Sequence, residues 1–147
     1  MKAWHFIAGV FAAAAVATIA SRGERNNNPL NIRRSRDEWR GLAPKQNDPE
    51  FFQFISPEYG FRAAYKTLLT YRNKYGLKTI AGIINRWAPP SENDTRQYIG
   101  YISEKTGFDP HAALPLDLYP RLLLHMAELE TGKEYPAGVI EKGVSLA

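Results

Sequence analysis

The stretch SPEYGFRAAYKTLLTYRNKYG, residues Ser56–Gly76, carries the strongest helical pattern in the chain. Ser56 offers a capping oxygen, Pro57 suits the first helical position, and Glu58 complements the helix dipole in the first turn. Apolar side chains then recur with the spacing of one helix face, at Phe61, Ala64, Tyr65, Leu68 and Leu69. Because Gly76 is a typical residue just past a helix end, the sequence predicts a helix over residues 57–75.

Three further helical patterns follow toward the C-terminus. One opens at Thr79 and ends at Ala88, directly before two prolines. The second covers about residues 94–106 and the third about residues 118–131, and each is followed by glycine. Only FFQF, residues 51–54, reads as a strand, so the predicted fold class is mainly α.

The segment before this helical region is polar and irregular. Residues 22–50 have no sustained apolar period and are rich in Asn, Pro, Gly and charge, as in RGERNNNPLNIRR at residues 22–34. Residues 22–45 hold seven Arg or Lys against three Asp or Glu. Such a loop suits a polyanion, although solvated arginines that serve solubility fit the same composition.

The N-terminus is apolar. Residues 3–21 carry no full charge, and a membrane-spanning helix needs roughly 17 to 25 such residues. The segment also has the parts of a secretory signal, with a basic start, an apolar run and a cleavage position after Ala20. We therefore expect residues 1–21 to be a signal anchor or signal peptide, and residues 22–147 to be one domain. A buried N-terminal helix is the alternative.

The composition narrows the chemistry. At 147 residues with 44% hydrophobic content the chain can form one domain with a core. It has no cysteine, and its three histidines lie far apart, so we expect neither a metal nor a cofactor. A Gly-rich phosphate loop and a GxSxG elbow are both missing from the sequence. The remaining carboxylates, amides and aromatic rings are typical of a sugar site.

These stretches together resemble a group of bacteriophage and prophage proteins that are virion structural or lysozyme-like. The shared pattern is RNNNPxNIR, WxG, FxxFxSPxYGxRA and RWAPPxENDTxxYI, and it spans residues 22 to about 107. More distantly, the order of the motifs is similar to the glucosaminidase and lytic transglycosylase branch of the lysozyme superfamily. The resemblance implies a lysozyme-like helical domain, behind the N-terminal hydrophobic helix, that acts on the glycan strands of peptidoglycan.

The resemblance also implies the site residues. A glutamate general acid is expected, with Glu24 as the first candidate and Glu58 as the second. The substrate-binding candidates supply amides, hydroxyls and rings: Asn26, Asn27, Asn28, Asn31, Trp39, Ser56, Tyr59, Asp94, Thr95 and Tyr98.

Each candidate also has a structural interpretation. In the glucosaminidases the catalytic glutamate precedes the asparagine loop by a helix turn or more, whereas Glu24 stands two residues before Asn26. Glu24 is equally a charge partner for a neighbouring arginine, and Glu58 suits the first turn of a helix. The asparagine run fits ordinary turn chemistry. Trp87 has core spacing, so Trp39 is the better candidate for stacking on a sugar.

Three functional hypotheses follow from the sequence. The first is a phage-type peptidoglycan glycosidase, such as an endolysin, that is anchored in the inner membrane through residues 3–21, exported to the periplasm or carried by the virion. The second is a non-catalytic virion structural or peptidoglycan-binding protein, which contacts other virion proteins. The third, a nucleic-acid binder, depends on the arginines alone and ranks last.

Overall fold

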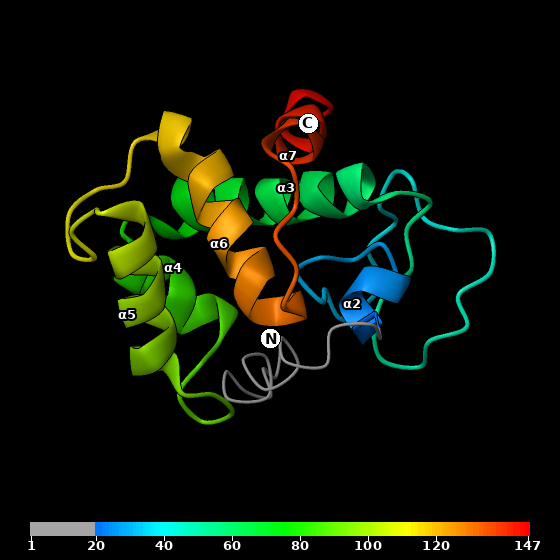
Figure 1. The fold of residues 1–147 in the computed structure, drawn as a ribbon, viewed down its shortest axis with the longest axis horizontal. Coiled ribbons are helices and arrows are strands. Elements are labelled where there is room, and N and C mark those ends of the chain that lie inside the picture. The colour runs from blue at the N-terminus through cyan, green and yellow to red at the C-terminus, as the bar shows by residue number, and fades with distance from the viewer. Residues whose placement is uncertain (1–19) are drawn as a thin grey trace.

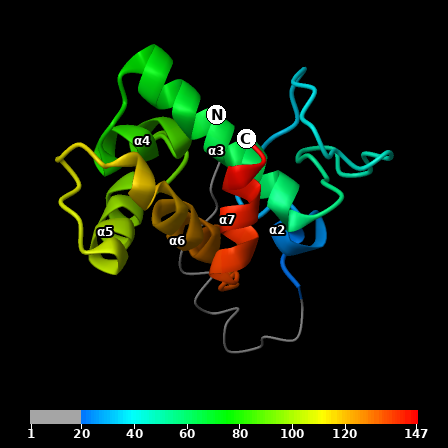
Figure 2. The ribbon, with the colours of Figure 1, turned by 90° about the horizontal axis from the view of Figure 1, so that it is seen from above.

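The computed structural model describes residues 20–147 of the chain, and helices dominate them (Figure 1). In chain order these are α2 (Arg22–Arg25), α3 (Pro57–Tyr75), α4 (Ile80–Trp87), α5 (Thr95–Thr106), the 3-10 turn η1 (Leu116–Leu118), α6 (Tyr119–Thr131) and α7 (Ala137–Ser145). The long α3 spans the molecule, and α6 and α7 pack against it. In both views α4 and α5 lie at one end of α3, and an irregular segment between α2 and α3 projects at the other end (Figure 2).

The four predicted helices are confirmed as α3, α4, α5 and α6, and their ends follow the capping chemistry. The side chains of Thr79 and Asp94 accept hydrogen bonds from backbone N–H groups in the first turns of α4 and α5. Gly76, Gly107 and Gly132 adopt positive φ directly after α3, α5 and α6. Trp87 is buried in the core, as its spacing predicts.

Two helices were not predicted from the sequence. The first is the single-turn α2, which begins after Ser21, whose hydroxyl accepts a hydrogen bond from the backbone N–H of Glu24. The second is α7, which packs closely along α3. A Cβ atom at Gly143 would lie 2.6 Å from the Glu58 carbonyl oxygen, so this close packing requires glycine.

The irregular segment is held by its own small core. Phe52, Phe54 and Ala63 are buried together, with Trp39 and Tyr59 packed against them. The FFQF stretch contributes two isolated antiparallel bridges, through Phe51 and Phe54, and no named strand. A strand does not extend here because the backbone of this stretch also pairs with asparagine side chains, as described below.

The predicted fold class, a lysozyme-like helical domain behind a membrane-anchor helix, requires correction. Within residues 20–147 no helix is both long enough and apolar enough to cross a bilayer. Ala20 and Ser21, the expected end of the anchor, lie outside any helix, and Ser21 caps α2 instead. The physical reason is that the serine hydroxyl satisfies a free N–H group at the start of a new helix. The remainder of the expected anchor, residues 1–19, lies outside the described residues.

Candidate functional site

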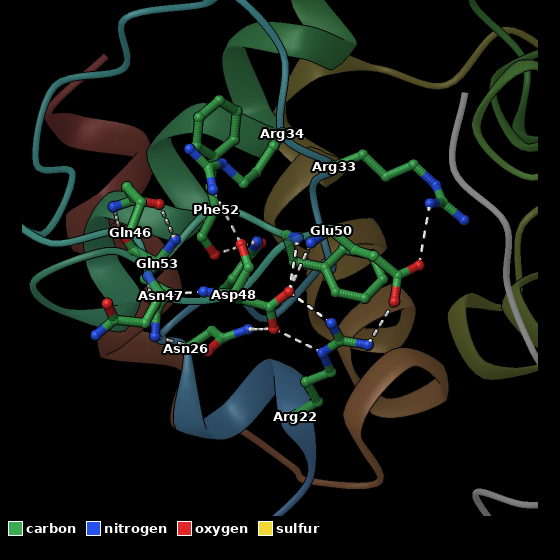
Figure 3. Close-up of polar contacts among 12 residues, drawn as sticks. Arg22, Asn26, Arg33, Arg34, Gln46, Asn47, Asp48, Glu50, Phe52 and Gln53 are labelled. Carbon is green, nitrogen blue, oxygen red and sulfur yellow. Dashed lines mark hydrogen bonds and ion pairs between the residues drawn. The ribbon is translucent and has the colours of Figure 1, made fainter.

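Asp48 is the centre of a polar cluster that joins α2 to the irregular segment (Figure 3). Its buried carboxylate accepts hydrogen bonds from Arg22 Nε at 2.6 Å and Asn26 Nδ2 at 2.9 Å. It also accepts from Arg22 Nη2 and from two backbone N–H groups, those of Glu50 and Phe51. The Arg22 guanidinium, together with these N–H donors, holds the pKa of Asp48 well below its usual range against the opposing effect of burial.

The four asparagines of the predicted glycan-binding loop donate their amide protons to the protein itself. Asn26 donates to Asp48, and Asn27 donates to the carbonyl of Phe54. Asn28 is fully buried, donates to the carbonyls of Ile32 and Phe52, and accepts from the Ile32 N–H. Asn31 donates to Glu130. These amides connect the loop to residues 52–54 and to α6.

Glu24, the first candidate acid, lies on α2 and is partly exposed. Its carboxylate forms an ion pair with Lys133 Nζ at 3.1 Å, which links α2 to the segment after α6. Burial first, and then the charge of Glu24, raise the pKa of the Tyr135 hydroxyl to about 12. Glu24 therefore lies beside Lys133 and near the buried Tyr135.

The candidates around the start of α3 are separate from Glu24. Glu58 lies in the first turn of α3 and is half-buried. Ser56 is the N-cap residue of the same helix, without a side-chain capping bond. The Tyr59 ring packs under Gly41 and lies 5.7 Å from the Arg40 guanidinium. These three side chains therefore surround the helix start.

The candidates at the start of α5 have structural partners, and one of them contacts a glutamate that the sequence analysis missed. Asp94 caps α5, and the buried Thr95 hydroxyl donates to the Ala88 carbonyl. Tyr98 is fully buried and donates its hydroxyl proton to Glu130 Oε2 at 3.2 Å. Burial first, and then Glu130, raise the pKa of Tyr98 well above its ordinary value.

Glu130 is held on α6 from two sides, because Asn31 Nδ2 donates to Glu130 Oε1 at 3.2 Å. Two candidates that are far apart in sequence, Asn31 and Tyr98, therefore meet at one buried carboxylate. The sequence could have pointed to Glu130 through its position on α6 between the buried Leu129 and Thr131, where an acidic residue is unexpected.

Trp39 lies between two hollows on the surface around α3. The first, which we call the α3 hollow, has a volume of about 670 Å³ and is lined by Trp39, Lys66, Leu69, Thr70, Asn73 and Lys74. It combines one indole ring with hydroxyl, amide and ammonium groups, and none of its lining residues is acidic.

The second, which we call the arginine hollow, has a volume of about 440 Å³. Its lining combines arginines with aromatic rings: Ile32, Arg33, Arg34, Ser35, Asp37, Trp39, Thr67, Tyr71, Arg86 and Trp87. Burial raises the pKa of Tyr71 to about 12, and Arg86, stacked 5.2 Å from its ring, partly offsets that rise. Asp37, exposed and hydrogen-bonded to Ser35, is the one acidic residue in the lining.

With this geometry in view, the chain can be compared with known proteins. No protein-family model matches it. It is 41% identical to Protein P5 of Pseudoalteromonas phage PM2 over 153 residues, which cover 97% of this chain and 96% of that protein. The chain belongs to the Protein P5 family. It is thus related to a phage protein over almost its whole length.

In this member of the Protein P5 family, the predicted site residues do not gather in one groove. Glu24 and Glu58 line none of the hollows described here. Asp94 and Thr95 line a third hollow of about 540 Å³ beside α5, together with His111 and Arg96. Trp39 is the candidate that lines two hollows at once.

Within residues 20–147 of this Protein P5 family member, no three His, Asp or Glu side chains are placed to hold a metal ion. Polar chemistry around Trp39 is instead supplied by arginine, lysine, amide and hydroxyl groups. Such groups bind acceptor-rich ligands.

Proposed function

We propose that this protein is a virion-associated phage protein that binds the glycan strands of peptidoglycan through the surface on both sides of Trp39. The observation that carries the proposal is the position of this indole between two hollows that supply hydrogen-bonding side chains. The sequence resemblance to virion structural or lysozyme-like phage proteins supports the choice of ligand, and kinship with a phage protein supports the association with a virion.

The chemistry of the surface suits a sugar polymer. A pyranose ring presents an apolar face that packs on an aromatic ring, and its hydroxyl and acetamido groups need polar partners at the edges. Thr70 and Asn73 offer such partners on one side of Trp39, and Ser35 and Thr67 offer them on the other. Two hollows that share one ring therefore suit successive units of a polymer.

The same surface supports binding better than cleavage. A glycosidase needs a carboxylic acid within reach of the glycosidic oxygen. Asp37 is the one carboxylate that lines either hollow beside Trp39, and it is exposed and accepts a hydrogen bond from Ser35. Neither Glu24 nor Glu58 lines these hollows, so the surface around Trp39 offers binding groups without a buried acid.

We expect Trp39→Ala to weaken binding to purified peptidoglycan sacculi about thirtyfold, because loss of a central tryptophan costs about 2 kcal/mol of binding free energy. The measurement is co-sedimentation of the full-length protein with sacculi over a range of sacculus concentrations. Ile55→Ala is the matched control, since Ile55 is an exposed apolar residue of the same segment that lines neither hollow. Equal binding by native protein and Trp39→Ala contradicts the proposal.

A second candidate function is a peptidoglycan glycosidase in which Glu24 is the general acid. The observation in its favour is a partly exposed carboxylate directly before the asparagine loop. Its position counts against it, because Glu24 pairs with Lys133 and lines none of the hollows described above. We rank it second for that reason.

Glu24→Gln tests the glycosidase directly, with release of soluble muropeptides from sacculi as the measurement. An enzyme that uses Glu24 loses at least about a hundredfold in rate, in line with the contribution of general acid catalysis. Glu58→Gln is the parallel variant for the second candidate acid. If the native protein releases no muropeptides yet binds sacculi, the binding function stands alone.

A further inference from the structure

Three buried hydrogen-bond donors at the arginine hollow have no partner within residues 20–147. They are Nε of Arg33, Nε1 of Trp39 and Nε of Arg86, all from residues that line this one hollow. Buried polar atoms in folded proteins are nearly always paired, and an orphan donor costs about 1 to 3 kcal/mol. Three orphan donors on side chains that line one hollow therefore favour a ligand rich in acceptors.

From these donors we infer that the arginine hollow is a carboxylate subsite, which takes the free lactyl carboxylate of an N-acetylmuramic acid unit that carries no stem peptide. Arginine pairs bidentately with a carboxylate through parallel N–H groups, and such charge-assisted bonds are among the stronger ones in proteins. The inference rests on the proposed function for the sugar part of the ligand. The carboxylate itself follows from the donors.

The position of Arg86 is fixed before any ligand arrives. Its guanidinium lies 4.0 Å from the centre of the Tyr75 ring and 5.2 Å from that of Tyr71, so it is stacked on two aromatic rings. No ion pair neutralises Arg86 within residues 20–147, and no carboxylate lies within 4.0 Å of it there. The Arg86 guanidinium is therefore a positioned cation, and its N–H groups are not engaged by a carboxylate.

The other charges around the hollow favour a single negative charge on the ligand. Arg33 already shares its charge with Glu50, at 3.6 Å, and Asp37 adds a carboxylate to the lining. Arg34 directs its guanidinium toward the carbonyl of Asp48 on the other side of the segment (Figure 3). Arg34 and Arg86 have no ion pair within residues 20–147, and Asp37 offsets one of these two charges, so about one positive charge remains, which suits a carboxylate better than a doubly charged phosphate.

The test compares N-acetylmuramic acid with N-acetylglucosamine, which lacks the lactyl ether that carries the carboxylate. The readout is the indole N–H signal of Trp39 in the NMR spectrum of the full-length protein, assigned with Trp39→Phe. We expect N-acetylmuramic acid to shift this signal saturably and to bind about tenfold more tightly than N-acetylglucosamine. Inorganic phosphate is the third probe, and binding of phosphate as tight as that of N-acetylmuramic acid overturns the assignment to a carboxylate.

Two variants locate the subsite. Arg86→Gln should weaken N-acetylmuramic acid about tenfold and leave N-acetylglucosamine unchanged, and Arg33→Gln is a second variant at a partly exposed position. Arg36→Gln is the matched control, because Arg36 is an exposed arginine of the same loop that lies outside the lining. Equal affinity for both sugars in the native protein overturns the subsite, and so does an unchanged preference in both hollow variants.

The two proposals fail in different ways. If N-acetylmuramic acid binds as expected but sacculi do not, the carboxylate subsite stands and the glycan-strand function is wrong. If sacculi bind through Trp39 and the native protein shows no preference between the two sugars, the glycan-strand function stands and the subsite is wrong.

Discussion

Asp48→Asn is expected to lower the free energy of unfolding by about 3 to 5 kcal/mol at neutral pH. The buried carboxylate oxygen Oδ2 accepts from Arg22 Nε and Asn26 Nδ2, and each hydrogen bond to a charged group contributes about 1.5 to 3 kcal/mol. In Asp48→Asn an NH2 group takes the place of this oxygen and faces the two donors, whereas Arg22 keeps its ion pair with Glu50. Against a typical total stability of about 5 to 15 kcal/mol, the loss is large. Urea unfolding followed by circular dichroism measures it.

The effect of Asp48 should depend on pH in a defined direction. Its pKa in the folded protein lies below that of an unfolded aspartate, about 3.9, so its stabilisation is fully present above that value. As the pH falls below about 4 the stabilisation is lost, and the difference between native protein and Asp48→Asn should shrink. Glu50→Gln is the control, because Glu50 pairs with the same arginine from an exposed position and should cost less than about 1 kcal/mol. Equal losses in the two variants contradict this interpretation.

The helical part of the fold could be predicted because its signals are local. The ends of α3 are specified by Pro57 and Gly76, within a few residues of the positions that they control. α7 was missed because its sequence, AGVIEKGVS, is short and carries two glycines, which weaken a helix in isolation. Its stability comes from packing along α3, where Gly143 permits close approach, and that contact joins residues far apart in the chain.

The asparagine loop shows where local patterns end. The sequence indicates a loop whose amides bind something, and it suggests a glycan. In the structure Asn27 and Asn28 bind the backbone of residues 52–54, and Asn31 binds Glu130 on α6. Both Asn27 and Asn31 adopt a φ of 51°, a left-handed conformation that asparagine tolerates better than most residues. Turn chemistry and tertiary hydrogen bonds therefore account for the asparagines without a ligand.

The candidate site also differs from the one expected from the sequence, because tertiary contacts determine it. Trp39 remains a candidate for stacking on a sugar, and the residues that share its hollows come largely from α3 and α4, which no local motif links to it. Arg86 was part of the RWAPP motif, but the motif does not show that its guanidinium lies over Tyr71 and Tyr75 of α3. The proposed site therefore consists of side chains that only the tertiary fold brings together.

Asn28→Asp is expected to lower the free energy of unfolding about as much as Asp48→Asn does, with the opposite dependence on pH. The Asn28 amide donates to the carbonyl oxygens of Ile32 at 3.0 Å and Phe52 at 2.9 Å, and the side chain is completely buried. A carboxylate in its place would direct a negative charge at two acceptors and find one N–H donor, that of Ile32. An uncompensated buried charge costs about 3 to 5 kcal/mol.

The pH dependence identifies the charge as the cause. Burial and two facing carbonyls would raise the folded-state pKa of the introduced aspartate above about 3.9, so the variant is destabilised increasingly as the pH rises past that value. Near pH 3 both states are protonated and most of the loss should disappear, whereas the native protein weakens there through Asp48. Asn47→Asp, at an exposed asparagine of the same segment, should change the free energy of unfolding by less than about 0.5 kcal/mol. A loss in Asn28→Asp that is equal at pH 3 and pH 7 would mean that shape, and not charge, makes this position require asparagine.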